Sequence, residues 1–504
     1  MLVLETLKAF SETGRTALIH PLGSLSYRDL EIRSDAFARW LLDTLGEDRS
    51  PVVLWGDKEA DLLPCLLGAL KSGRAYVPID SVIPKDRAAQ IVAAVDPKVV
   101  VAFTGEELPW EGRTLSPEKL EAVLSAPGEK VPPENWVQKS DPAYILFTSG
   151  STGRPKGVPI TAGNLDAFCQ GLLPHYPKEG GVILHQVSYS FDVSGCAVYA
   201  GLCRGMTLFT VDHQMAAGLG ECFDALERSG LTLWVSTPSF GELCIQSQRF
   251  DQTLLPHLRQ FLFCGEVLTH ALCDALSERF PKAQILNTYG PTEATVLVTA
   301  AEVTEEMRRD SLPIPIGRAI DGVTLRLEQE GREVTEEGQA GELLILGPTV
   351  GPGYLGQPDE AKKVFFIDPE TGLRGYRTGD LCFFRNGLYH YCGRADNQLK
   401  LNGYRIELED IEENLQRLRN VRRAAVIPVR DQEGIVQYLA AFLLLQESDG
   451  LTPLKRAIAL KKEAAAYLPP YMIPRKILAV ESFPLNVNGK IDRKALAARL
   501  EKTP

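Results

Sequence analysis

A segment rich in glycine and hydroxyl groups has the composition of a phosphate-binding loop. Residues 148–157 read TSGSTGRPKG and follow a short apolar run that predicts a strand. Glycine lets the backbone approach a bulky anion and turn its N–H groups inward. The segment is not a Walker A loop, because Pro155 stands where that motif needs glycine before the lysine. A flexible surface loop fits the composition as well. The side chains that can donate to phosphate oxygens are Thr148, Ser149, Thr152 and Lys156.

A second segment, residues 287–293, combines an aromatic ring, a tight turn, a hydroxyl and a carboxylate after another predicted strand. Tyr289 can stack on a base, and Glu293 can hold Mg²⁺ because hard cations prefer oxygen ligands. A purely structural turn is equally compatible with this segment taken alone. Its residues are Asn287, Thr288, Tyr289, Gly290, Pro291, Thr292 and Glu293.

A third segment, residues 376–380, ends in Asp380 directly after a glycine. A carboxylate in this position can accept both hydroxyls of a ribose, although Thr-Gly-Asp is also an ordinary turn sequence. A fourth segment covers residues 393–407 and a fifth covers residues 484–494, where an Asn-Gly turn presents Lys490. Taken alone, these two segments fit a linker and a solvated surface lysine.

Short apolar runs alternate with helical patterns between about residues 50 and 300. This alternation predicts an α/β fold with largely parallel sheets. The expected strands are 52–55, 98–103, 143–148, 231–236, 260–264 and 284–287, and two of the expected helices are 59–71 and 267–279. From about 312 to 395, short runs with many Gly and Pro turns predict a small β-rich subdomain.

The pattern changes again near Asp396. A helix at 408–420, strands at 421–430 and 435–445, and a helix at 453–466 predict a compact α+β domain. This part, residues 397–504, carries 18 Lys and Arg against 13 Asp and Glu, whereas the rest is strongly acidic. We therefore expect domains at 1–396 and 397–504, and the charge split suits closure over an anionic ligand.

The 504 residues carry a formal net charge of -11, which argues against general nucleic-acid binding. The N-terminus does not resemble a secretory signal, and no apolar run is long enough to insert into a membrane. The ten cysteines include no CxxC pair and no metal-ligand spacing. We expect a cytoplasmic protein with reduced cysteines.

Together and in this order, the five segments resemble the adenylate-forming superfamily of acyl-CoA synthetases, luciferases and nonribosomal peptide synthetase adenylation domains. The resemblance implies a large N-terminal domain and a small mobile C-terminal lid that meet at a hinge matching Asp396. It also implies that ATP and Mg²⁺ activate a carboxylic acid as an acyl-AMP, and that a phosphopantetheine thiol then attacks this intermediate.

The resemblance also implies roles for individual residues. Lys490 matches the lysine that bridges the carboxylate and the phosphate during adenylation, and Lys400 lies in the loop that replaces it in the second step. Asp380 matches the ribose-binding carboxylate, Tyr289 lies near adenine, and Glu293 assists Mg²⁺. The remaining matches to the nucleotide site are Thr148, Ser149, Thr152, Lys156, Asn287, Thr288, Gly290, Pro291, Thr292, Tyr391, Cys392, Gly393 and Arg394.

The segment Phe191-Asp192-Val193-Ser194 bears on the choice of acid. In amino-acid-activating members, the matching Asp binds the α-ammonium group of the substrate, and a buried carboxylate needs such a partner. A helix N-cap or a surface Asp is the simpler alternative. Within this group the chain is most similar to the D-alanine–D-alanyl carrier protein ligases, where Cys264 and Val296 match residues beside the substrate side chain. Residues 195–199 depart from the usual pattern of that group.

This resemblance implies D-alanine as substrate, a phosphopantetheinylated carrier protein acting in trans, and D-alanylation of (lipo)teichoic acid. The basic C-terminal domain is expected to help dock an acidic carrier. Three alternatives remain open: an adenylation enzyme for another small amino acid in a natural-product pathway, an inactive carrier-binding scaffold, and an acyl-CoA synthetase.

Overall fold

The computed structural model describes residues 1–105, 108–149, 155–178, 180–395, 398–401, 403–431, 434–447, 450–484 and 491–500. The chain forms two compact units. The larger one comprises Met1–Ser81, Val92–Leu146 and Gly157–Ala395, and the smaller one comprises Val82–Ile91, Phe147–Lys156 and Asp396–Pro504. The predicted hinge residue, Asp396, lies outside the described residues.

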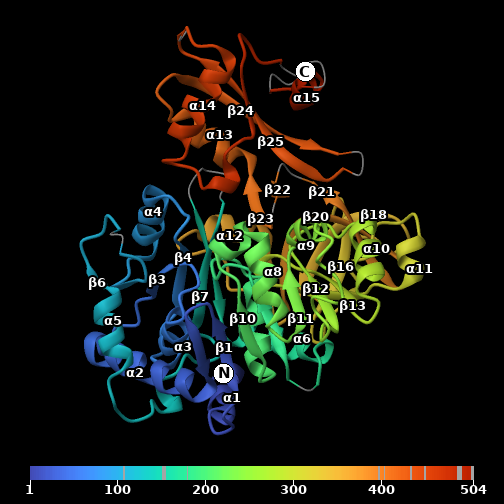
Figure 1. Ribbon diagram of the computed structural model, residues 1–504. Coiled ribbons are helices and arrows are strands. Elements are labelled where there is room, and N and C mark those ends of the chain that lie inside the picture. Colours follow the sequence, from blue (N-terminus) through green and yellow to red (C-terminus); the bar gives the residue numbers. More distant parts are fainter. Residues whose placement is uncertain are drawn as a thin grey trace. The chain divides into compact units, whose positions relative to one another are not determined.

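A six-stranded sheet forms the first layer of the fold. Its strands, in spatial order, are β6 (Arg113–Leu115), β5 (Val99–Ala102), β3 (Val52–Gly56), β4 (Tyr76–Asp80), β7 (Pro142–Thr148) and β8 (Lys156–Thr161). The strands from β6 to β7 run parallel. Helix α3 (Leu62–Lys71) packs against β3 and β4 and against α2 (Tyr27–Leu45) (Figure 1). All residues of α3 are buried. Helices α4 (Lys85–Val95) and α5 (Pro117–Leu124) complete the crossovers.

A nine-stranded sheet carries most of the candidate site. Its spatial order is β15 (Arg318–Ala319), β14 (Thr299–Glu302), β13 (Gln284–Tyr289), β12 (Gln260–Phe263), β11 (Leu231–Ser236), β9 (Val182–His185), β10 (Thr207–Thr210), β1 (Thr16–His20) and β2 (Gly23–Ser26). The strands from β13 to β1 are parallel, and antiparallel strands β14 and β2 adjoin them. Parallel strands end at one edge, so the loops after β9, β12 and β13 meet there.

The remaining helices of the larger unit connect or flank these strands. They are α1 (Leu2–Phe10), α6 (Ala162–Leu172), α7 (His213–Ala217), α8 (Leu219–Glu227), α9 (Pro238–Ile245), α10 (His270–Arg279), α11 (Glu305–Arg309) and α12 (Pro358–Val364). A third, antiparallel sheet contains β17 (Arg332–Glu333), β16 (Thr324–Gln329), β18 (Ala340–Leu346), β20 (Arg374–Arg385) and β19 (Phe365–Ile367), and β21 (Leu388–Arg394) pairs with β20. This sheet occupies the region predicted to be β-rich.

The smaller unit has its own hydrophobic core. Its elements are β22 (Gln398–Leu401), β23 (Tyr404–Glu407), α13 (Leu408–Gln416), β24 (Val421–Arg430), β25 (Val436–Leu445), α14 (Pro453–Ala464), β26 (Lys476–Ala479) and α15 (Arg493–Leu500). Leu408, Ile411 and Leu415 lie on the buried face of α13, as their spacing predicts. The predicted class, an α/β fold with parallel sheets and a small C-terminal α+β domain, is confirmed.

Two predicted helices begin three residues later than expected, for local reasons. The Glu59 carboxylate accepts the N–H of Asp57 at 2.9 Å, which forms a turn, and α3 starts only at Leu62. Thr269 is the N-cap of α10, because its hydroxyl accepts the Leu272 N–H at 3.1 Å. Over the described ranges, no helix combines the length and apolar character needed to cross a membrane.

Candidate functional site

The segment after β13 is held in a tight turn at the carboxyl edge of the nine-stranded sheet. A Cβ at Gly290 would lie 2.4 Å from the Leu297 Cα, so only glycine allows this close approach of two backbones. The short helix η4 (Thr292–Ala294) follows. This packing fixes the directions of Tyr289, Thr292 and Glu293.

Asp380 and Tyr289 are 91 residues apart in the sequence and in contact in the fold. The Tyr289 hydroxyl donates to Asp380 Oδ2, and Arg394 Nη1 donates to Asp380 Oδ1 at 2.6 Å. Burial and the neighbouring Asp380 carboxylate raise the pKa of Tyr289 well above its ordinary value, so the phenol stays a neutral donor. Asp380 is only 4% exposed and its N–H donates to the Thr378 hydroxyl at 2.9 Å. The carboxylate is therefore held in one orientation.

The strand that carries Arg394 brings a second ring to this position. Tyr391 lies with its ring centroid 6.5 Å from that of Tyr289, at an interplanar angle of 33°. Gly393 adopts φ +134°, a conformation that L-residues rarely adopt. Cys392 is exposed, and its thiol donates to the Leu381 carbonyl at 3.2 Å. Three predicted segments thus converge on Asp380, Tyr289 and Arg394.

Two residues that are predicted to bind the nucleotide have side chains that donate hydrogen bonds to the backbone. Asn287 Nδ2 donates to the Pro315 carbonyl at 2.8 Å, and the Thr288 hydroxyl donates to the Phe263 carbonyl at 2.8 Å. The second bond ties β13 to the end of β12. These contacts make both side chains supports for the loop that follows them.

Asp192 contacts the loop that follows β13. The Thr292 hydroxyl donates to Asp192 Oδ2 at 2.6 Å, although the two residues are 100 positions apart. Asp192 is half-buried, and the helical residues that follow it begin at Ser194 and continue into the π-helical turn η3 (Cys196–Gly201). A carboxylate in this position can bind an ammonium group.

Cys264 and Val296 are both 1% exposed. Val296 has φ +72°, which is unusual for a β-branched residue, and a Cβ at Gly195 would lie 3.2 Å from its Cγ2. A larger residue at position 195 would therefore press against Val296. Cys196 was missed by the sequence analysis. Burial raises the pKa of its thiol well above the ordinary value, and nearby Cys264 and Asp192 add to the effect.

Glu293 is fully buried. The Tyr354 hydroxyl donates to Glu293 Oε1 at 3.0 Å, and the Gly351 N–H donates to its carbonyl at 2.8 Å. Its donor set, a carboxylate beside a neutral hydroxyl, fits the preference of Mg²⁺ for hard oxygen ligands.

The smaller unit contains the other predicted phosphate and catalytic residues. The Thr148 hydroxyl is buried and has no hydrogen-bond partner within the described ranges. It can therefore donate a hydrogen bond to an anion. Ser149 is used differently: its hydroxyl donates to the Arg405 carbonyl at 2.9 Å and accepts the Glu407 N–H at 3.1 Å. Lys156 begins β8, and Lys400 lies opposite Arg405 in the β22–β23 hairpin. Thr152 and Lys490 lie outside the described residues.

The chain is similar to known proteins over nearly its whole length. The D-alanine–D-alanyl carrier protein ligase of Bacillus cytotoxicus is 39% identical over 492 residues, which is 96% of each chain. The ligase of the same name from Bacillus anthracis is 39% identical over 497 residues, 98% of each chain.

Solved structures share the fold. The holo form of PA1221, an NRPS protein containing adenylation and PCP domains, has a TM-score of 0.84 at 26% identity and covers 99% of this chain and 84% of its own. The Vibrio cholerae adenylation domain AlmE, in complex with glycyl-adenosine-5'-phosphate, has a TM-score of 0.81 at 22% identity and covers 100% and 97%. Two family models match, "AMP-binding enzyme" at residues 7–355 and "AMP-binding enzyme C-terminal domain" at residues 410–490. The chain belongs to the AMP-binding enzyme family.

Proposed function

We propose that this chain is an AMP-forming acid–thiol ligase that activates D-alanine as D-alanyl-AMP and transfers it to the phosphopantetheine thiol of a separate carrier protein. The observation that carries the proposal is the contact between Asp192 and Thr292. It joins an ammonium-binding carboxylate to the loop whose Tyr289 contacts Asp380. The full-length relatives named D-alanine–D-alanyl carrier protein ligase support the same substrate and partner.

In this proposal the nucleotide is a substrate, and each part of it is assigned to particular residues. The Asp380 carboxylate accepts the ribose hydroxyls, Tyr289 and Tyr391 flank the base, and Arg394 contacts the nucleotide. We assign the Thr148 hydroxyl, together with Thr152 and Lys156, to the phosphate oxygens, because the sequence of this segment suits anion binding. Glu293 would hold Mg²⁺, and the ion would supply positive charge to the phosphates. The backbone of Asn287, Thr288, Gly290 and Pro291 shapes the wall of the site.

The chemistry requires two displacements. In the first, a carboxylate oxygen of the amino acid bonds to the α-phosphorus of ATP, and pyrophosphate leaves. In the second, the carrier thiol loses its proton, its sulfur bonds to the acyl carbon, and AMP leaves. Lys490 neutralises the negative charge that develops in the first displacement. Lys400 belongs to the hairpin that serves the second displacement, after the C-terminal domain has rotated about Asp396.

Selectivity for the amino acid rests on charge and on size. Asp192 pairs with the α-ammonium group, which fatty and aryl acids lack. In this proposal the buried side chains of Cys264 and Val296 line the part of the site that receives the substrate side chain, and they favour a small one. A difference of one methyl group in such a pocket is worth about 1–3 kcal/mol, so glycine and D-serine are expected to be poor but measurable substrates.

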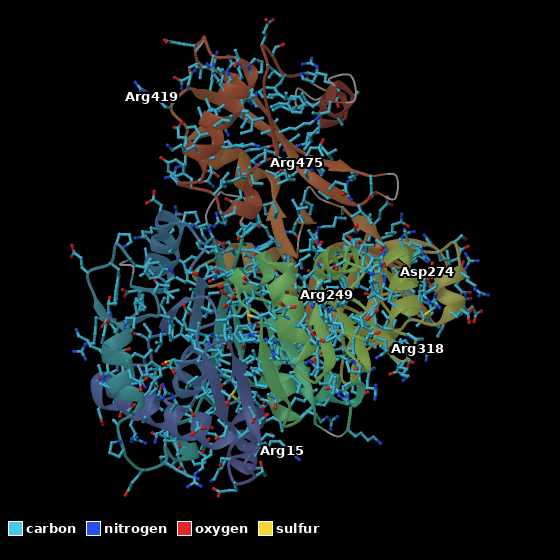
Figure 2. The ribbon with its side chains drawn as sticks, in the orientation of Figure 1. Arg15, Arg249, Asp274, Arg318, Arg419 and Arg475 are labelled. Carbon is cyan, nitrogen blue, oxygen red and sulfur yellow. The ribbon has the colours of Figure 1, made fainter. Side chains whose placement is uncertain are left out.

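The carrier is proposed to dock on the basic C-terminal domain. Residues 397–504 have an excess of five positive charges. Arg419 and Arg475 are exposed there (Figure 2). Complementary charge raises association rates and is screened by salt. Charge reversal at Arg419 and Arg475 is expected to raise the carrier KM and flatten its salt dependence, with pyrophosphate exchange unchanged. Unaltered loading at every salt concentration would remove this part of the proposal.

The location and pathway follow from the same proposal. The ten cysteines are free, as in reducing compartments, and this supports a cytoplasmic enzyme. D-alanylation of (lipo)teichoic acid is the use we propose for the loaded carrier. An enzyme for a different small amino acid in a natural-product pathway is the alternative.

The decisive experiment is ATP–pyrophosphate exchange with D-alanine, L-alanine, glycine and D-serine, followed by loading of a phosphopantetheinylated carrier and of coenzyme A. We expect D-alanine to give the highest kcat/KM and the carrier to be loaded in preference to coenzyme A. A preference for another amino acid would favour the alternative pathway. Exchange with none of them would indicate an inactive scaffold, and efficient coenzyme A loading would indicate an acyl-CoA synthetase.

A further inference from the structure

A cluster of charged side chains that belongs to none of the five motifs lies at the carboxyl ends of strands from both parallel sheets. Asp57 follows β3, Asp80 ends β4, and His213 begins α7 directly after β10. His213 Nε2 lies 3.0 Å from both carboxylate oxygens of Asp80 and 3.4 Å from Asp57 Oδ1. The backbone N–H of His213 donates to Asp57 Oδ2 at 3.0 Å. One imidazole thus bridges two carboxylates.

The surroundings favour the charged form of this imidazole. Asp80 is 4% exposed, so its charge is poorly solvated and needs a partner. The hydrogen bond to Asp80 is the main cause that raises the pKa of His213 above its ordinary 6.5, and burial opposes it. The other charged or titratable groups around the cluster are Lys58, which lowers the pKa of His213, and Glu59, His20, His185 and Asp212.

Asp80 also holds the loop that leads to Asp192. The Ser188 hydroxyl donates to Asp80 Oδ2 at 2.5 Å, and the Ser190 N–H donates to the Ser188 hydroxyl at 3.3 Å. The Ser190 hydroxyl donates to the carbonyl of Pro78, in the same strand β4, at 3.1 Å. Two residues later comes Asp192. The position of the proposed ammonium-binding carboxylate therefore depends on β4 and on the state of Asp80.

We propose that His213 is a positioning residue: in its protonated form it fixes Asp80, and through Ser188 it fixes the loop that presents Asp192 to the substrate ammonium group. This inference rests on the proposed function, because it assigns Asp192 to the amino acid. The His213 ring contacts Asp80 and Asp57 and acts on Asp192 only through Asp80 and Ser188, so its contribution belongs to substrate affinity rather than to the rate of the chemical step.

The direction of the pH effect follows from the sign of the shift. The raised pKa means that the bridge is intact at low pH and is lost as the pH rises through the pKa of folded His213. Above that pH, the imidazolium charge of His213 between Asp57 and Asp80 is lost. The hydrogen bond by which Asp80 positions Ser188 is then weakened. The KM for the amino acid is then expected to rise with pH, while kcat changes little.

A bound metal ion is the competing explanation for the same geometry. Ligand atoms of Asp57, Asp80 and His213 all lie within 4.8 Å of one another, and carboxylate and imidazole groups can bind divalent cations. However, the buried Lys58 ammonium lies 3.4 Å from Asp57 Oδ1. This positive charge opposes a dication, so the geometry favours a proton on His213.

The test is ATP–pyrophosphate exchange with D-alanine between about pH 6 and about pH 9, for the wild type and three variants. We expect His213→Gln to raise the D-alanine KM about tenfold at low pH and to make it independent of pH. His213→Lys, which keeps a cation at all these pH values, should keep the low KM throughout. His257→Gln, at an exposed histidine of the same unit, is the matched control and should follow the wild type.

Ser188→Ala separates positioning from general structural damage. It removes the hydroxyl between Asp80 and the loop, so the KM for D-alanine should be high and independent of pH. The imidazole of His213, followed by NMR, should still titrate above its ordinary pKa. The proposal is wrong if His213→Gln retains the wild-type pH profile, if kcat alone changes, or if free protein binds Zn²⁺ only when His213 is present. Failure of the proposed function would instead appear as no D-alanine-dependent exchange by the wild type at about pH 6.

Discussion

The charge of Asp192 can be tested by a substitution that changes almost nothing else. Asp192→Asn keeps the shape of the side chain and an oxygen that can accept the Thr292 hydroxyl, now at 2.6 Å from Oδ2. It removes the negative charge that we assign to the substrate ammonium group. A hydrogen bond to a charged group contributes about 1.5–3 kcal/mol, which corresponds to a loss of about 10- to 150-fold in kcat/KM for D-alanine.

The assay is ATP–pyrophosphate exchange at saturating ATP, with the KM for ATP measured separately. Because the Asp380–Tyr289–Arg394 contacts do not include Asp192, the KM for ATP should change less than about twofold. Asp274→Asn, at an exposed residue that pairs with Arg308, is the matched control (Figure 2). If Asp192→Asn lowers kcat/KM for D-alanine by less than about threefold, the carboxylate does not bind the ammonium group. An equal rise in both KM values would show that the whole loop had moved.

Three further changes test other parts of the molecule. Cys264→Ala enlarges the pocket and should lower the D-alanine over L-alanine preference about tenfold in the exchange assay, and an unchanged ratio would place Cys264 away from the substrate side chain. Lys490→Ala should reduce adenylation by at least about a hundredfold while preformed D-alanyl-AMP is still transferred to the carrier, and equal loss of both steps would contradict a role confined to the first. Lys71→Met should lower the free energy of unfolding, measured by urea denaturation, by about 3–5 kcal/mol. The reason is that buried Lys71 Nζ lies 2.8 Å from Glu31 and 2.9 Å from Asp35, so its loss leaves two buried carboxylates without a cation. An unchanged denaturation midpoint would mean that water reaches these carboxylates.

The parts of the site that the sequence predicts are those in which a strand, a turn and a reactive side chain are adjacent in the chain. Tyr289 is the last residue of β13 and Glu293 comes four residues later, and Asp380 follows a glycine with φ +70°. Such segments combine a strand signal with a turn signal, and both depend on neighbouring residues only. The order of the five segments then indicated the family, and with it the two-part fold.

The partners of these residues could not be predicted in the same way. Nothing in the sequence near Thr292 indicates that its hydroxyl binds Asp192, and nothing near Ser149 indicates that its hydroxyl is occupied by the backbone of Arg405 and Glu407. Such contacts arise from the order of strands in the sheets, because strands far apart in the chain end at one edge. Helix starts were misplaced for a similar reason, since a side chain such as Glu59 can form a turn that replaces the first helical turn.

The His213 cluster could not be predicted from the sequence, because its residues lie far apart in the chain. Asp57, Asp80 and His213 come from the ends of three strands in two sheets, and each is surrounded in the chain by residues of unrelated type. A residue that contacts a ligand must have a particular side chain, and in a local motif several such side chains stand close together in the sequence. A residue that holds another residue needs only the right charge at the right place, which any strand ending at that edge can supply. Positioning residues of parallel-sheet enzymes are therefore to be sought at the carboxyl ends of strands that carry no motif, and Asp80 at the end of β4 is such a case.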